Sequence, residues 1–187
     1  MSVVLAPTDI VKYCLLMSTR PTARFHIAPA PVGLHRVQDL LNTRALAAKG
    51  FPDLLADGVT ASQSLDADLT DADARELRGL RSALEELIAG TSPSINPVGA
   101  ELSVDATGVV RLSPSGGGWE YVASQVWAEV LLAQQTDTWR RLKRCRNELC
   151  GTAFYDRSRN NSGVWHDVKT CGNTANLRAS RARRRSE

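Results

Sequence analysis

Apolar residues recur every three or four positions in three stretches of the chain, the spacing typical of amphipathic α-helices. These stretches are residues 34–48, 70–89 and 119–133. In the second, Thr70 is a helix-capping residue with acidic residues behind it, and Gly90 follows the last apolar position. Gly50 supplies a similar stop for the first stretch. A shorter apolar stripe at residues 10–15 predicts one more helix near the N-terminus.

Other parts of the chain lack the helical period. Residues 101–112 alternate between apolar and polar positions around a turn at 105–108, which predicts a β-hairpin. Residues 51–65 are acidic and irregular, and we expect them to form a connection. The predicted fold class is therefore mainly α with a small β-hairpin.

Three arginines lie off the apolar face of the predicted 70–89 helix, namely Arg75, Arg78 and Arg81. Glutamates lie beside them, so solvated ion pairs are the expected arrangement. The alternative is that these arginines line a ligand site.

The charge of the chain is divided between its two ends. Residues 140–185 hold thirteen Lys/Arg against three acidic residues, a balance of about +10, whereas residues 1–139 hold ten against sixteen. A basic end joined to an acidic body is typical of a nucleic-acid-binding module attached to a separate domain. The alternative is a basic tail that docks on the acidic face of its own chain. We expect a helical N-terminal domain at 1–139 and a small module at 140–187.

Composition excludes some classes of protein. Hydrophobic residues make up 43% of the 187, and no apolar run approaches the roughly 20 residues that cross a bilayer. The chain begins without a basic segment ahead of an apolar run, so no secretory signal is expected. Cysteines in metal-ligand spacing favour a reducing compartment. The expected location is the cytoplasm, with no membrane partner.

The basic segment contains four residues that are typical metal ligands. Cys145, Cys150, His166 and Cys171 follow a Cys-x4-Cys-x15-His-x4-Cys pattern. Thiolate and imidazole groups in two short-range pairs are typical of structural zinc modules. The alternative, a chance cluster of free cysteines and one histidine, leaves a short polar segment with little to hold it folded. We therefore predict zinc as the cofactor.

At these residues the sequence resembles the CGNR zinc-finger family of bacterial proteins. The matching residues are Cys145, Cys150, the run FYDRSRN at 154–160, Trp165, and Cys171, Gly172 and Asn173. In the commonest pattern of the family a cysteine follows the tryptophan and an arginine ends the last motif. Here those positions are His166 and Thr174. Histidine also binds zinc, so the first difference keeps a ligand at that position. Thr174 replaces an arginine and removes one positive charge. Gly163 and Val164 stand where the family often has arginines, so they also remove positive charge.

Further upstream, the run LLNTR at residues 40–44 is similar to the opening motif of the helical, ABATE-like domain that the family usually carries. That domain has been proposed to sense stress or a small ligand. The resemblance implies a DNA-binding transcriptional regulator that responds to stress, with a small-molecule effector as a further partner. Basic charge alone does not separate DNA from RNA.

The residues expected to contact nucleic acid lie around and after the metal ligands. A predicted helix from Asn173 to about Arg183 would present arginines every three or four residues, with Leu177 facing the zinc core. The predicted contacts are Arg157, Arg159, Lys169, Arg178, Arg181, Arg183, Arg184 and Arg185. For the last three arginines alone, a disordered basic end is the alternative. Tyr155 and Trp165 are expected to fill the small core.

No catalytic motif accompanies these residues. After His166 the sequence continues with Asp167 and Val168, without the glutamate that zinc deaminases place two residues after the histidine. The three glycines at 116–118 lack the lysine of a phosphate-binding loop. We expect no enzymatic activity. Two alternatives remain, an RNA-binding protein and a small-molecule-binding or enzymatic body whose finger mediates assembly.

Overall fold

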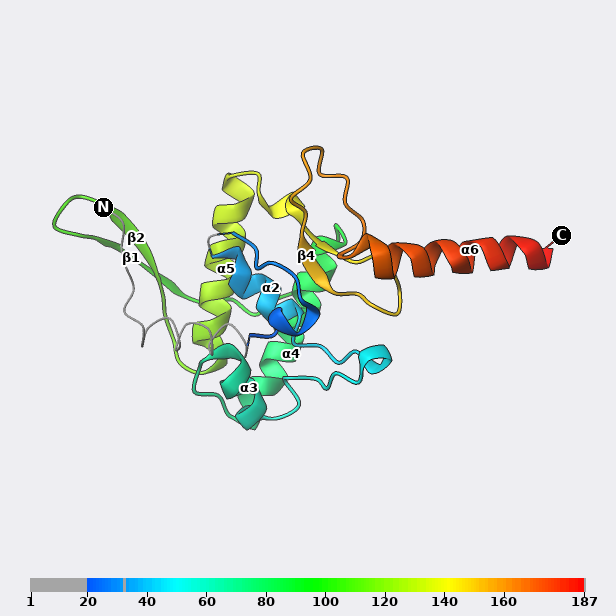
Figure 1. The fold of residues 1–187 in the computed structure, drawn as a ribbon. Coiled ribbons are helices and arrows are strands. Elements are labelled where there is room, and N and C mark those ends of the chain that lie inside the picture. Colours follow the sequence, from blue (N-terminus) through cyan, green and yellow to red (C-terminus); the bar gives the residue numbers. More distant parts are fainter. Residues whose placement is uncertain (1–19, 32, 187) are drawn as a thin grey trace, which may run out of the picture.

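The computed structural model describes residues 20–31 and 33–186, and the helix predicted at residues 10–15 lies outside them. The predicted fold class is confirmed. The described residues form five α-helices and two small antiparallel hairpins, each with two strands. Figure 1 shows the helical body in the middle, with one hairpin and the last helix extending from opposite sides.

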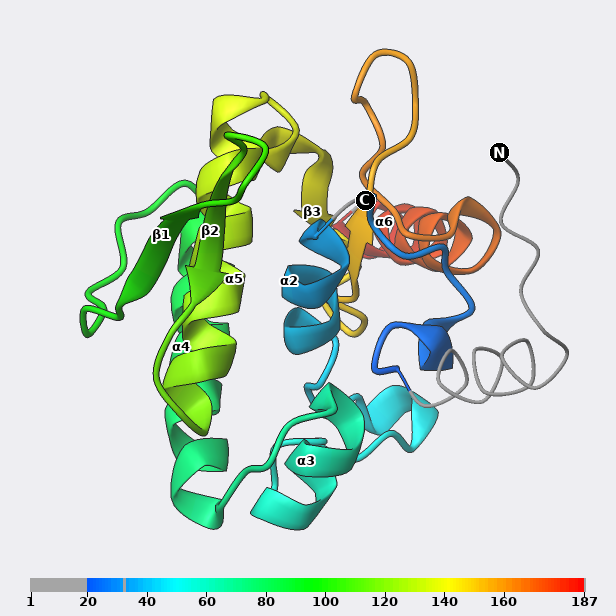
Figure 2. The same ribbon diagram turned by 90° about the vertical axis from the view of Figure 1, so that its left-hand side faces the viewer.

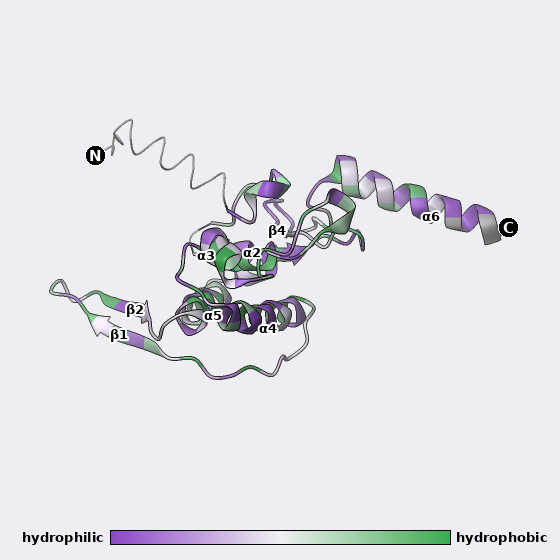
Figure 3. Cartoon of the chain, turned by 90° about the horizontal axis from the view of Figure 1, so that it is seen from below, coloured by the Kyte–Doolittle hydropathy of each residue, from purple (hydrophilic) through white to green (hydrophobic). Residues whose placement is uncertain are grey.

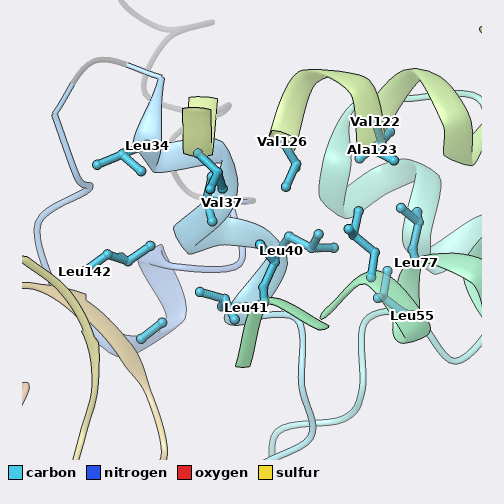
Figure 4. Close-up of a cluster of buried hydrophobic side chains, with 14 of the residues drawn as sticks. Leu34, Val37, Leu40, Leu41, Leu55, Leu77, Val122, Ala123, Val126 and Leu142 are labelled. Carbon is cyan, nitrogen blue, oxygen red and sulfur yellow. The ribbon is translucent and has the colours of Figure 1, made fainter. Parts of the chain in front are cut away.

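Three helices enclose the core of the body. These are α2 (Leu34–Leu41), α4 (Asp71–Ile88) and α5 (Trp119–Gln135). Figure 4 shows Leu40 of α2 between Leu77 of α4 and Val126 of α5, and all three side chains are buried. Burial of each such side chain contributes about 1.5–3 kcal/mol, so this cluster is the main source of stability.

The predicted capping signal of α4 is present and also serves a second helix. Thr70 and Asp73 form a capping box, in which each side chain accepts the other's backbone amide. The second oxygen of Asp73 accepts the amide of Trp119, the first residue of α5, at 3.0 Å. Between them, Gly118 has a φ of 54°, and a Cβ there would lie 2.5 Å from Asp73 Oδ1. One carboxylate therefore caps both long helices.

Two helix boundaries differ from the sequence prediction. The helix predicted over residues 34–48 is only α2, because it ends at Leu41, where the buried side chain of Asn42 turns to partners far along the chain. A short 3-10 helix, η2 (Ala47–Lys49), precedes Gly50. The connection predicted at 51–65 contains α3 (Gly58–Leu65), whose N-cap Asp57 accepts the amide of Thr60.

The predicted hairpin is present. Strands β1 (Ala100–Val104) and β2 (Val110–Pro114) pair in antiparallel register, with Leu102 opposite Leu112. Figure 2, viewed from the left-hand side of Figure 1, shows the pair lying outside α5. Its apolar side chains are largely exposed, with Leu102 73% accessible.

The basic segment folds into small elements around the metal ligands. These are β3 (Leu142–Arg144), β4 (Ala153–Tyr155), a π-helical turn η4 (Val168–Gly172) and α6 (Asn173–Ser186), with a 3-10 turn η3 (Trp139–Arg141) ahead of them. Strands β3 and β4 pair antiparallel. Helix α6 projects away from the rest of the molecule, and Figure 3 shows that much of it is hydrophilic.

The basic segment is fastened to the body by a buried polar contact. The Asn42 amide nitrogen donates to the Ala153 carbonyl at 3.0 Å, and its oxygen accepts the Ala153 amide at 2.9 Å. Leu142 and Ala153 belong to the same buried cluster as α2. Arg44 and Arg144 both pair with Glu85 of α4. A division of the chain at residues 139 and 140 stays a prediction, since the two sides of that boundary share packing.

Among the described residues, none of the helices combines the length and the apolar character that crossing a bilayer requires.

Candidate metal centre

The four predicted ligands come together at one point. Cys145 follows β3, Cys150 closes the loop between β3 and β4, His166 lies in the long loop after β4, and Cys171 lies in η4. Their ligand atoms all lie within 4.8 Å of one another, and the three cysteines are buried. Folding therefore brings together residues that are separated by up to 26 positions.

The spacing of these atoms fits a tetrahedral zinc ion. With Zn–S near 2.3 Å and Zn–N near 2.0 Å, a sulfur and a nitrogen on one tetrahedron are about 3.5 Å apart. His166 Nδ1 lies 3.4 Å from Cys150 Sγ and 3.6 Å from Cys171 Sγ. The nitrogen that faces the thiols is Nδ1. The residues present therefore fit zinc, with four protein ligands and no position left for water.

Backbone hydrogen bonds shape the loop that holds the first two ligands. The Cys150 amide donates to the Asn147 carbonyl at 2.7 Å, and the Cys145 amide donates to the Thr152 carbonyl at 2.9 Å. Gly151 completes the turn with a φ of 61°, in the left-handed region that glycine favours. The loop places both sulfurs on one side.

Electrostatics at the site favour a thiolate. A hydrogen bond between the two sulfurs, in which Cys145 is the donor, holds the pKa of Cys150 well below its usual range and raises the pKa of Cys145. The Thr152 hydroxyl, fully buried, lies 3.0 Å from Cys150 Sγ and is placed to donate to it. Thiolate is the form of cysteine that binds zinc, and a bound divalent cation deprotonates further thiols. Thr152 is thus a supporting residue that was not predicted from the sequence.

Apolar side chains cover the centre. Phe154 is buried beside the three cysteines, and Trp165 and Ile27 pack partly buried against the same cluster. Trp165 therefore fills the small core as predicted, whereas Tyr155 packs against the helical core. Ile27 comes from the body, so part of the cover of the metal centre is supplied by a segment more than a hundred residues upstream.

Asp156 fixes the loop that leads to His166. Its buried carboxylate accepts hydrogen bonds from Lys143 Nζ at 2.7 Å and from the Gly163 amide at 2.7 Å. Burial alone would raise the pKa of Asp156, but these bonds and those from Ser158 outweigh it and lower that pKa. The only sequence signal for this role is the position of Asp156 within the run at residues 154–160.

The predicted nucleic-acid contacts lie in two groups. In the first group, Arg157 and Arg159 lie in the loop after β4 and Lys169 lies in η4, and all three are exposed. Arg157 donates to the Pro29 carbonyl at 2.7 Å, and its guanidinium group lies over the Tyr155 ring. In α6, Arg178, Arg181, Arg183 and Arg184 are exposed. Arg185 also lies in α6, although its side chain is outside the described part of the structure.

One expectation about α6 is wrong. Leu177 was predicted to face the zinc core, but it is 58% exposed, because α6 leaves the metal centre after its first turn and has no apolar surface beside it. The contact that does tie α6 to the zinc loop is polar, with Arg178 Nη1 3.4 Å from the Asn147 side-chain oxygen.

Comparison with known proteins agrees with this geometry. The family model described as the CGNR zinc finger matches residues 141–184, a segment that contains all four ligands and is less than half of the chain. A comparison with curated proteins gave no match. The matched segment and its four positioned ligands identify the C-terminal region as a zinc-binding module similar to the CGNR zinc finger.

Proposed function

We propose that this protein is a DNA-binding transcriptional regulator in which the zinc-binding module presents α6 to DNA. The observation that carries the proposal is the projection of α6, an exposed helix that bears five arginines and no acidic residue. Arg178, Arg181 and Arg185 follow one another at three- and four-residue spacing, so they lie along one side of the helix. Arginine in such a row favours contact with phosphate groups.

The dimensions of α6 favour DNA over RNA. Its 14 residues make a helix about 21 Å long at 1.5 Å per residue. The major groove of B-form DNA, about 12 Å wide, admits an α-helix, whereas the major groove of A-form RNA is too deep and narrow. A projecting basic helix therefore suits duplex DNA, and RNA binding is the outcome that would correct the proposal.

The zinc ion has a structural role in this proposal. Four protein ligands fill the coordination positions, so a water molecule has none to occupy, and a zinc-bound water is what zinc hydrolases use. The ligands instead hold η4 and the loop around Asn147 together at the base of α6. We accordingly propose that the module has no enzymatic activity.

Binding to labelled duplex DNA and duplex RNA, measured by fluorescence anisotropy at several salt concentrations, tests the proposal. We expect DNA binding that weakens steeply with salt, because phosphate contacts release counterions. The double variant R178A/R181A should weaken binding at least tenfold, whereas Arg75→Ala, an exposed arginine on α4, should not change it. Full binding by R178A/R181A would refute the role of α6.

A second proposal concerns the body, which we propose acts as an ABATE-like, stress-responsive sensor domain. A cavity of about 300 Å³ lies between α2, the end of α3 and α5, and its lining includes Arg36, Asp39 and Gln125. This volume is at the lower end of the range for small-molecule sites. Helices α2 and α4 pack against each other, so this cavity does not lie between them.

The buried Asp39 carboxylate indicates which kind of ligand would suit this cavity. It is 7% exposed, and its pKa is raised by burial despite hydrogen bonds from Thr22. A small polar effector that donates hydrogen bonds suits it. A thermal-shift screen of small polar metabolites tests this proposal, with Gln125→Trp as a variant that fills the cavity. A compound that stabilises both proteins equally binds elsewhere.

A further inference from the structure

An open groove lies where the body meets the base of α6. It has a volume of about 590 Å³, and its two sides come from distant parts of the chain. The body supplies Phe25, His26, Ile27 and Lys49, and the zinc-binding module supplies residues 166–170, which lead into α6. The groove therefore lies next to the start of α6.

The two sides of the groove are held in a fixed relation. Ile27 packs against the buried cysteines, and Arg157 donates to the carbonyl of Pro29, two residues further along the body segment. Behind them, Asn42 is bonded to both backbone groups of Ala153. The body is therefore part of the surface around α6, and the zinc-binding module is not joined to it only through a linker.

Each side of the groove carries one lysine. Lys49 and Lys169 are both exposed, and neither occurs in an ion pair among the described residues. Lys49 Nζ lies 5.7 Å from the centroid of the Phe25 ring, so the ring holds the ammonium group at the groove.

The one carboxylate in the groove lining belongs to Asp167 and accepts backbone hydrogen bonds. Asp167 Oδ1 accepts the amides of Lys169 at 2.8 Å and of Thr170 at 3.4 Å, which caps η4. It lies on the same side as Lys169, whereas no acidic residue of the lining comes from the body side. The body side of the groove therefore carries the positive charge of Lys49 with no acidic residue beside it in the lining.

We infer that the DNA backbone crosses this groove and that Lys49, on the body, contacts a phosphate there together with Lys169. The inference rests on the proposed function. A helix in the major groove has a phosphate backbone on each side of it, so a duplex engaged by α6 continues past the base of the helix. Residues outside the zinc-binding module then contribute directly to affinity.

The test compares Lys49→Ala with the control Arg75→Ala in the full-length protein, using one 20-base-pair duplex and anisotropy titrations across a salt series. We expect Lys49→Ala to weaken binding about three- to tenfold at low salt. The slope of log K against log salt should also fall by about 0.9, the value for one lost phosphate contact. Arg75→Ala should change neither quantity.

Further variants separate charge from folding. Lys49→Arg should retain wild-type binding, and Lys49→Gln, which keeps the stem over Phe25, should bind as weakly as Lys49→Ala. If all Lys49 variants bind like wild type while R178A/R181A is weakened, the inference is wrong and the proposed function stands. If wild-type protein does not bind duplex DNA at any salt concentration, both are wrong.

Discussion

Arg81 and Asp53 form a partly buried ion pair that joins α4 to the segment before α3. Two hydrogen bonds of 2.9 and 2.7 Å link the guanidinium group to the two carboxylate oxygens, and Arg81 is only 9% exposed. A further bond reaches the Thr43 hydroxyl. The sequence predicted a solvated ion pair between Arg81 and a glutamate of the same helix, which is wrong because its partner, Asp53, lies 28 residues away.

Replacing Asp53 by asparagine should therefore be costly. The change leaves a buried guanidinium group without a counter-charge, and breaking one side of such a pair typically costs about 3 kcal/mol. Urea unfolding at pH 7 measures the loss. The exposed Asp68→Asn serves as the control and should unfold like wild type.

The same variant should alter the dependence of stability on pH. Burial raises the pKa of Asp53, but hydrogen bonds from Arg81 and Leu55 outweigh it, and the pKa is lowered. A lowered pKa stabilises the folded state above the unfolded value of about 3.9, and this contribution is lost as the pH falls through the folded value. The stability difference between wild type and Asp53→Asn should thus shrink below about pH 4. A constant difference from pH 7 to pH 3 would contradict this assignment.

Between elements, the Asp73 carboxylate joins the starts of α4 and α5. Thr70→Ala removes one helix cap and should cost about 1 kcal/mol. Asp73→Ala removes the reciprocal half of that capping box and also the acceptor of the Trp119 amide, so we expect it to cost about twice as much. Chemical denaturation of both variants measures the two losses. Equal losses would mean that the contact with α5 contributes nothing.

Helix α6 has little packing along its length beyond η4. Isolated helices of about 14 residues are marginal in water, so its last turns should open readily. If α6 enters DNA as proposed, phosphate contacts should stabilise those turns. Hydrogen exchange of the α6 amides should then slow on addition of duplex DNA, whereas exchange in the β1–β2 hairpin should not change. Equal exchange with and without DNA would argue against insertion of α6.

The elements that the sequence predicted well are those whose signals are local. Helix α4 has its caps and its apolar stripe within 20 residues, and the β1–β2 hairpin has its turn between two alternating runs. The end of α2 was not predictable in this way, because the partner of Asn42 is Ala153, 111 residues away. Helix α3 is short, and its N-cap, Asp57, lies in a segment rich in other acidic residues.

On the scale of the molecule, the metal centre and the helical core depend on each other. The zinc ligands were predictable because a closed tetrahedral site needs four such residues at short spacing, whereas Thr152 and Ile27 have no sequence signal. Since Ile27 covers the centre and Ala153 belongs to the helical core, loss of zinc should affect both parts.

Removal of zinc should therefore destabilise more than the module. Elemental analysis should give about one zinc per chain, as expected for one four-ligand site. Cys150→Ser should abolish zinc binding, unfold the module and lower the melting temperature of the helical body, followed by far-ultraviolet circular dichroism. Cys150→His, which restores a zinc ligand, should recover part of the zinc content. An unchanged melting temperature of the body in metal-free protein would show that the two parts fold independently.

Asn42 is the residue through which this coupling can be tested. It is fully buried, and Asn42→Ala removes its hydrogen bonds to the Ala153 amide, the Ala153 carbonyl and the Thr22 hydroxyl, although Gln38 still donates to that carbonyl at 3.3 Å. The loss should cost about 3 kcal/mol, because buried polar groups lose their bonds. In wild type, thermal release of zinc and loss of helix should coincide. In Asn42→Ala they should separate, with zinc released first, since β4 is held less tightly to α2. The exposed Asn96→Ala should behave like wild type. If both transitions fall together in Asn42→Ala, the remaining contacts, among them the shared apolar cluster and the Arg144–Glu85 ion pair, are enough to couple the module to the body.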